Sequence, residues 1–200
     1  MAPHILFFDL ETRKRTTDLS KDNDEGWRLL REGKGGISAL AIWDNREEWC
    51  YFYDDSEIET IAAYLESAEI VVGFNSRFFD IPVVEGILGR RLALREHIDL
   101  YEEVKRGLSK LGQRGRKGEY TLGAICSRTL GGQGKLESGA LAPDLAKDGL
   151  WARLFRYCAD DVRKTRNLFG HIQSEGGIIS VNQTFLPIEL PNHLTPQARA

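Results

Sequence analysis

Short apolar runs predict a β-sheet in the first half of the chain. Residues 5–10 form a continuous apolar run with an acid near its end, which is typical of a central strand buried on both faces. Segments 37–43 and 48–53 are rich in β-forming residues and are separated by a polar DNRE turn. These three segments predict an antiparallel meander, and the polar stretch 12–36 predicts a long excursion between its first two strands.

A helical pattern and another apolar run follow the meander. Apolar side chains at positions 58, 61, 62 and 65 have the i, i+3, i+4, i+7 spacing of a helix, which we expect to be capped by Ser56 and to run through Glu66. The apolar run 69–75 comes next, so the order strand, helix, strand predicts a strand parallel to the first. A helix or turn over residues 77–88 then carries Asp80 near its start.

The second half of the chain favours helices. Residues 97–104 resemble a brief strand that passes into a helix, and segments 121–131 and 151–172 have helical spacing. The stretch 176–200 carries three prolines and sustains no helical period. We therefore expect one domain over residues 1–175 and an extended C-terminal tail or arm after it.

Composition supports a single domain without a global bias toward polyanions. The chain has 200 residues, 42% of them apolar, which is enough for one buried core. The formal net charge is −3, so attraction to nucleic acid depends on local charge. Cys50, Cys126 and Cys158 show no C-x-x-C spacing, which favours reduced thiols over zinc ligands or disulfides. No apolar run approaches the roughly 20 residues of a membrane span, so we expect a soluble, cytoplasmic protein without a membrane partner.

Four acids and one tyrosine are spaced so that folding can gather them in one pocket. Asp9 and Glu11 are two residues apart on a predicted strand, so their side chains point to the same face. Tyr157 and Asp161 are one helical turn apart and therefore lie side by side. Asp80 closes the segment GFNSRFFD. If the three segments converge, four carboxylates share one cleft.

Such a cleft requires cations. Two carboxylates about 6 Å apart at an effective dielectric near 20 repel by roughly 3 kcal/mol, and four acids repel one another pairwise. Hard divalent ions prefer carboxylate oxygens, which favours Mg²⁺ or Mn²⁺. Two such ions about 4 Å apart activate a water on one side of a phosphate and stabilise the leaving oxygen on the other. The predicted chemistry is therefore phosphodiester hydrolysis.

The three segments resemble the motifs of the DEDD superfamily of 3′–5′ exonucleases. FDLET contains Asp9 and Glu11, and GFNSRFFDIPVV is similar to the exonuclease motif of family B DNA polymerases. Tyr157 and Asp161 have the Y-x-x-x-D spacing of the tyrosine subgroup. The resemblance implies a ribonuclease H-like α/β fold, with a mixed five-stranded sheet flanked by helices.

The resemblance also implies a role for each residue. Asp9 would bridge two divalent ions, Mg²⁺ or Mn²⁺, while Glu11 and Asp161 would help to hold the first. Asp80 would serve the second ion, largely through water, and Tyr157 would orient the attacking water. Contacts to the substrate are expected from Thr12, Asn75 and Phe79.

The implied activity is hydrolysis of single-stranded nucleic acid from a free 3′ end, with release of nucleoside 5′-monophosphates. DNA is favoured over RNA because the second motif resembles that of DNA polymerases. No polymerase domain fits within 200 residues, so we expect a polymerase, helicase or repair factor to act as a separate partner.

A basic, glycine-rich stretch suggests a second contact with the substrate. Between positions 105 and 117 the chain carries cations and glycines but no acid. A cationic loop of this type grips a phosphate backbone without reading bases, although a solvated flexible loop fits the pattern equally well. The cations expected to contact substrate are Lys105, Arg106, Lys110, Arg114, Arg116 and Lys117.

Simpler interpretations exist for each motif and for the whole. Asp80 ahead of Ile81 and Pro82 fits an ordinary helix N-cap, and Tyr157 with Asp161 fits an exposed helix pair. The alternative function is a catalytically silent nucleic-acid-binding or partner-docking domain with the same fold. An endonuclease is a third hypothesis, because the chemistry at phosphorus is alike. The presence of all four acids argues against the silent domain.

Overall fold

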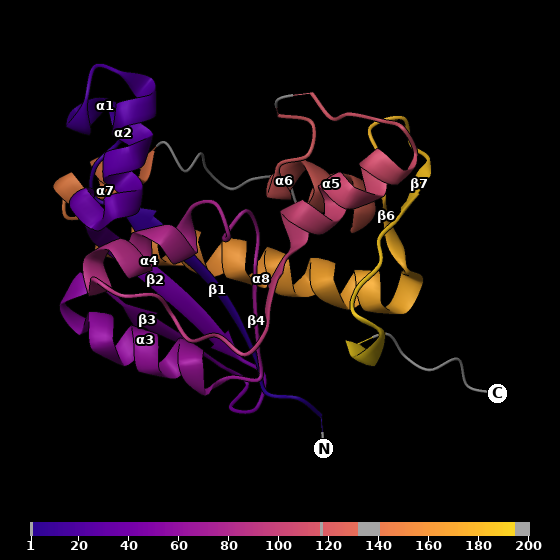
Figure 1. The fold of residues 1–200 in the computed structure, drawn as a ribbon, viewed down its shortest axis with the longest axis horizontal. Helices are drawn as coiled ribbons and strands as arrows, with labels where there is room; N and C mark the ends of the chain where they lie inside the picture. The colour runs from indigo at the N-terminus through magenta and orange to yellow at the C-terminus, as the bar shows by residue number, and fades with distance from the viewer. Residues whose placement is uncertain (1, 117, 132–140, 195–200) are drawn as a thin grey trace.

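A five-stranded sheet forms the centre of the structure, a computed structural model that describes residues 2–116, 118–131 and 141–194 (Figure 1). The strand order is β3-β2-β1-β4-β5. The strands are β1 (Ile5–Thr12), β2 (Ile37–Asp44), β3 (Trp49–Tyr53), β4 (Ile70–Gly73) and β5 (His97–Asp99).

The pairing of β1 confirms the predicted mixed sheet. β1 runs antiparallel to β2, with Asp9 opposite Ala41, and β2 continues antiparallel into β3. On its other side β1 is parallel to β4, with Phe7 opposite Val72, and β4 is parallel to β5. The α/β class and the antiparallel meander followed by a parallel strand are as the sequence predicted, and the sheet is consistent with a ribonuclease H-like fold.

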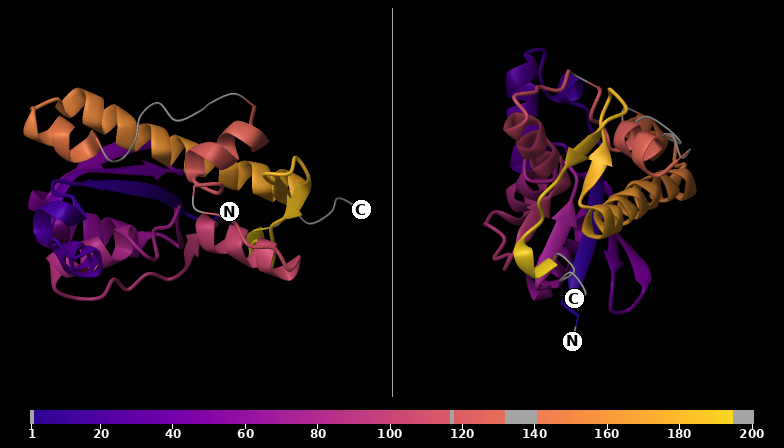
Figure 2. Two further views of the ribbon diagram at one scale, coloured as in Figure 1. Left: turned by 90° about the horizontal axis from the view of Figure 1, so that it is seen from above. Right: turned by 90° about the vertical axis from the view of Figure 1, so that its right-hand side faces the viewer.

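Different helices cover the two faces of the sheet (Figure 2). Leu6, Phe8 and Leu10 pack into one core with α3 (Ile58–Ser67) and α4 (Asp80–Leu88). Ile5 and Phe7 enter the opposite core. That core is shared with α5 (Leu100–Lys110), α6 (Leu122–Thr129), α7 (Ala142–Lys147) and α8 (Trp151–Glu175). Because side chains alternate along a strand, Asp9 and Glu11 continue the row of Ile5 and Phe7 toward α8.

The long helix α8 forms because its apolar residues repeat with helical spacing. Leu154, Cys158, Val162 and Leu168 are all at most 1% exposed. The helix ends where Gly176 adopts a left-handed conformation with φ of 77°. Among the described residues no helix is long and apolar enough to cross a bilayer.

The polar excursion after β1 is folded and packs against α4. It forms α1 (Thr16–Leu19), α2 (Asn23–Leu29) and the π-helical turn η1 (Leu30–Lys34). A Cβ added to Gly86 would lie 2.4 Å from the carbonyl oxygen of Arg31, so the backbones of α4 and η1 are in direct contact. Glycine permits this close approach and thereby fixes the excursion beside the helix that begins with Asp80.

Two predictions about the ends of helices were wrong. Ser56 does not cap α3, because the Asp54 carboxylate accepts the Ser56 amide at 2.8 Å and the 3₁₀ turn η2 (Asp55–Glu57) precedes the helix. The cationic stretch from position 105 is not a single loop, because α5 continues to Lys110. Burial of Leu100, Val104 and Leu108 at helical spacing accounts for this extension.

The C-terminal segment packs into the core instead of forming an extended arm. β6 (Gly177–Ile179) and β7 (Phe185–Pro187) pair as an antiparallel hairpin, and the 3₁₀ turn η4 (Asn192–Leu194) follows. Its buried apolar side chains belong to the same core as α8, and they are Ile178, Leu186, Ile188, Leu190 and Leu194. Residues 195–200 lie outside the described ranges. Pro187 lies at the end of β7, where a strand tolerates a residue without an N–H.

Candidate metal centre

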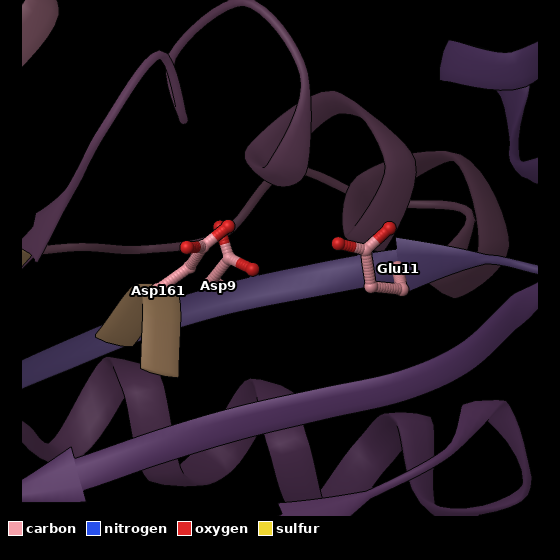
Figure 3. Close-up of side chains that lie close together, drawn as sticks. All are labelled: Asp9, Glu11 and Asp161. Atoms are coloured by element: carbon pink, nitrogen blue, oxygen red, sulfur yellow. The ribbon is translucent and has the colours of Figure 1, made fainter. Parts of the chain in front are cut away.

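Three carboxylates from two distant segments meet above the end of β1. Asp9 and Glu11 come from the strand, and Asp161 comes from α8. One potential ligand atom from each lies within 4.8 Å of the others. Figure 3 shows the Asp9 and Asp161 carboxylates close together and Glu11 further along β1 on the same side. This donor set contains only carboxylate oxygens, which fits a hard divalent cation.

The fourth acid lies beside the same strand. Asp80 is the first residue of α4 and is 3% exposed. Its Oδ1 accepts the backbone N–H of Leu10 at 3.0 Å, so α4 is anchored to β1 between Asp9 and Glu11. Asp80 adds to the group formed by Asp9, Glu11 and Asp161 without belonging to the set of ligand atoms within 4.8 Å.

Burial and mutual repulsion make the proton affinity of this site high. Burial raises the pKa of Asp9 well above its usual value, and the charges of Asp80, Asp161 and Glu11 raise it further. Burial also raises the pKa of Asp80 to about 7, although the hydrogen bond from Leu10 acts in the opposite direction. The cluster is therefore costly to keep fully ionised, which is the electrostatic condition that a bound cation relieves.

Tyr157 lies beside the acids as its spacing predicted. It is 4% exposed, and it lies on α8 one turn before Asp161. Burial raises the pKa of Tyr157, and the charges of Asp161, Glu11 and Asp9 raise it further. The phenol therefore keeps its proton at neutral pH and acts as a hydrogen-bond donor.

Lys164 is a further buried residue of the site. It is 3% exposed, and its Nζ lies 2.5 Å from Asp160 Oδ2 and 3.1 Å from Asp161 Oδ1. The spacing of three and four residues was the available signal, since it places the lysine over both acids on one helix face. Its ammonium offsets part of the negative charge around Asp161.

Asp99 is a second residue that the sequence did not single out. It is 1% exposed, and it caps α5 through the amides of Tyr101 and Glu102. It also accepts the backbone N–H of Asn75 at 2.8 Å and of Arg77 at 2.9 Å. Asp99 therefore holds the loop that leads into Asp80. Asn75 in this loop adopts a φ of 61°, which asparagine tolerates better than most residues.

Of the three predicted substrate residues near the motifs, Asn75 lines the cavity that contains Asp9 and Asp161, whereas Thr12 and Phe79 do not. Asn75 lines a cavity of about 450 Å³ whose walls include Asp9 and Asp161. Thr12 is 7% exposed, and its hydroxyl donates to the Lys14 carbonyl at 2.9 Å. The Phe79 ring is in edge contact with Trp27, with 6.0 Å between ring centroids. The remaining walls of the cavity are Phe74, Tyr101, Gly118, Tyr120, Thr121 and Leu122.

The predicted cations lie on two different faces. Lys105, Arg114 and Arg116 line a second cavity of about 570 Å³. Arg106 and Lys110 instead line another cavity of about 370 Å³, where Arg106 pairs with Glu103 and Lys110 with Glu189. Lys117 lies outside the described residues.

Comparison with known proteins finds likeness in structure alone. No family model matches the sequence, and no curated protein matches it. Among solved structures the chain is similar to the family B DNA polymerase from the hyperthermophilic archaeon Pyrobaculum calidifontis, with a TM-score of 0.61 and 19% sequence identity. The match covers 86% of this chain and 25% of the polymerase chain. At this identity the likeness shows a shared fold.

Proposed function

We propose that this chain is a metal-dependent 3′–5′ exonuclease of the tyrosine-containing DEDD type. The proposal rests on the convergence of Asp9, Glu11 and Asp161, whose ligand atoms lie within 4.8 Å of one another. The three ordered motifs and the fold shared with a DNA polymerase support it. The substrate is single-stranded nucleic acid with a free 3′ end, DNA in preference to RNA, and the products are nucleoside 5′-monophosphates.

The surroundings of Asp9 support a division of roles. The charges of Asp80, Asp161 and Glu11 all raise the pKa of Asp9, so Asp9 lies among the other acids and would suit a ligand shared by two ions. Glu11 and Asp161 would complete the first site, and Asp80 would serve the second, largely through water. When bound, the ions would lower the pKa of a coordinated water and neutralise developing charge on the phosphate.

The side chains around the acids would orient the reaction. Tyr157 retains its proton at neutral pH, so its hydroxyl would hold the attacking water by a hydrogen bond without removing its proton. Asn75 faces the cavity beside Asp9 and would contact the terminal nucleotide. Thr12 belongs to the first motif and Phe79 to the second, and both would pack against the terminal sugar or base.

The direct test uses a linear single strand labelled at either end, with Mn²⁺ or Mg²⁺. We expect stepwise loss of mononucleotides from the 3′ end and no cleavage of a circular single strand. Asp9→Asn should reduce the rate by about 1,000-fold, because several kcal/mol of charge stabilisation are lost. Glu59→Gln on α3, an exposed acid, is the matched control and should retain full activity. Cleavage of the circle would instead assign an endonuclease.

Thermal melting separates an enzyme from a silent domain of the same fold. A ligand that binds only the folded state at about 100 times its Kd stabilises it by roughly 2.7 kcal/mol, so Mn²⁺ should raise the melting temperature clearly. Asp9→Asn should abolish that increase. A wild-type protein that melts at the same temperature with and without Mn²⁺ would favour the silent domain.

A further inference from the structure

The cavity beside the acids adjoins a second, cationic cavity. The first holds Asp9, Asp161 and Asn75, and the second holds Lys105, Arg114 and Arg116. Tyr101 and Tyr120 line both, so the two cavities share a wall. An aromatic boundary therefore lies between the acids and the cations.

The aromatic boundary is held in place by its neighbours. The Tyr101 ring lies 5.5 Å from the Phe74 ring, with Lys105 Nζ 4.9 Å from the Tyr101 ring centroid. The Arg128 guanidinium lies 5.5 Å from the centroid of the Tyr120 ring. Proteins that bind single-stranded nucleic acid stack bases on aromatic side chains and bind the phosphates with nearby cations.

Residues 112–116 form part of the wall of the cationic cavity. A Cβ added to Gly115 would lie 2.5 Å from the Tyr120 ring, so the loop packs directly on that ring. The Gln113 amide donates to the Leu108 carbonyl at 2.9 Å, and the Arg116 amide donates to Glu119 Oε2 at 2.7 Å. Within the described ranges no carboxylate pairs with the guanidinium of Arg114 or Arg116, which leaves both charges available to phosphates.

We propose that the cationic cavity binds the phosphates of a single strand that lie 5′ to the scissile bond. This inference builds on the proposed function, and it defines the preferred substrate as a strand of several nucleotides rather than a dinucleotide. The 3′ end would occupy the acidic cavity, the strand would pass Tyr101 and Tyr120, and the next phosphates would meet Arg114 and Arg116. A backbone gripped in this way carries no base preference.

The test compares Arg114→Ala/Arg116→Ala with wild type on oligothymidylates of 2 and 12 nucleotides. Binding is measured by fluorescence anisotropy of 5′-labelled strands without metal, and cleavage is measured as kcat/KM with Mn²⁺. The double variant should bind the 12-mer about 10-fold more weakly, and its salt dependence should fall by about 1.4 in slope, because two phosphate contacts are lost. Its kcat/KM for the dinucleotide should equal that of wild type.

Arg90→Ala/Arg91→Ala is the matched control, since it removes two charges that pair with Glu66 and Glu85 on another surface. It should leave 12-mer binding unchanged. Equal 12-mer affinity of wild type and the Arg114/Arg116 variant would overturn the proposal, and so would an equal loss on both lengths or equally tight binding of duplex DNA. If no strand is cleaved but the anisotropy difference holds, the exonuclease assignment fails while the binding cavity stands.

Discussion

The buried Lys164 ammonium lies between the carboxylates of Asp160 and Asp161, and it offsets part of their negative charge. Its Nζ contacts Asp160 at 2.5 Å and Asp161 at 3.1 Å, and all three residues are at most 8% exposed. Removing one partner of a buried ion pair leaves an uncompensated charge, whereas removing an exposed partner costs little. The same helix carries an exposed counterpart, Arg163, which pairs with Asp160 at 2.5 Å.

We predict that Lys164→Met lowers the free energy of unfolding by about 3–5 kcal/mol in EDTA, because Asp160 and Asp161 lose a buried cation. Arg163→Ala, whose side chain is 42% exposed, should cost at most about 1 kcal/mol. Urea unfolding measures both. Mn²⁺ should recover part of the loss in Lys164→Met by neutralising Asp161. A Lys164→Met protein as stable as wild type in EDTA would show that the contacts of Lys164 with Asp160 and Asp161 contribute nothing to stability.

Asp80 makes the stability of the metal-free protein depend on pH. Its pKa in the folded state is raised to about 7, from a usual value of 3.8. The folded state therefore binds more protons than the unfolded state between these values, so the stability contributed by protonated Asp80 is present below pH 4 and is lost as the pH rises toward 8. The loss is on the order of 4 kcal/mol.

Melting in EDTA across this pH range checks the prediction. Asp80→Asn should remove much of the decline, because an amide does not titrate, and should be more stable than wild type at pH 8. Mn²⁺ should stabilise wild type more at pH 8 than at pH 5, where protons compete with the metal. A wild-type protein whose metal-free stability is constant from pH 4 to 8 would contradict this account.

At the scale of elements, local periodicity predicted the placement of the acids. The i, i+2 spacing of Asp9 and Glu11 and the i, i+4 spacing of Tyr157 and Asp161 are properties of a strand and a helix, so they are readable in the sequence. The burial of Lys164 depends on packing of α8 against α6, where Cys126 Sγ lies 3.8 Å from the Lys164 carbonyl oxygen. Contacts between distant segments of this type have no local signal.

Asp99 shows the same limit in a helix cap. An aspartate between a short strand and a helix is a readable N-cap signal, and Asp99 has this position. The structure confirms the predicted transition from strand to helix within residues 97–104. The amides of Asn75 and Arg77 reach the same carboxylate only because β4 and β5 are parallel neighbours. One carboxylate therefore joins the start of α5 to the loop that positions Asp80.

We predict that Asp99→Ala costs about 2–4 kcal/mol, because it removes a cap and leaves two further amides without an acceptor. Asp22→Ala is the matched control. Asp22 caps α2 through the Glu25 amide at 2.8 Å, and its loss should cost about 1 kcal/mol. Hydrogen exchange should show loss of protection at Asn75 and Arg77 in Asp99→Ala alone. Equal costs for the two variants would reduce Asp99 to an ordinary cap.

At the scale of the whole molecule, the site exists only when the complete fold has formed. Asp9 on β1 and Asp161 on α8 are far apart in sequence, yet each offers a ligand atom within 4.8 Å of the other. Asp80, at the start of α4, is joined to β1 through the Leu10 amide. Metal binding at this site would therefore be linked to global stability, since the unfolded chain cannot bring these acids together. The site then depends on every segment that unfolds together with β1, α4 and α8.

The C-terminal hairpin allows a test of whether residues 176–194 belong to the same folding unit, because its neighbouring residues Phe185 and Leu186 face solvent and core, respectively. Leu186 is 1% exposed in the core shared with α8, whereas Phe185 is 50% exposed. We predict that Leu186→Ala costs about 2–5 kcal/mol through lost burial and a residual cavity, while Phe185→Ala costs less than about 1 kcal/mol. Urea unfolding measures both, and the Mn²⁺-induced rise in melting temperature should persist in each. Equal small costs would mean that residues 176–194 contribute little to the folding unit, and that the acids depend on residues 1–175 alone.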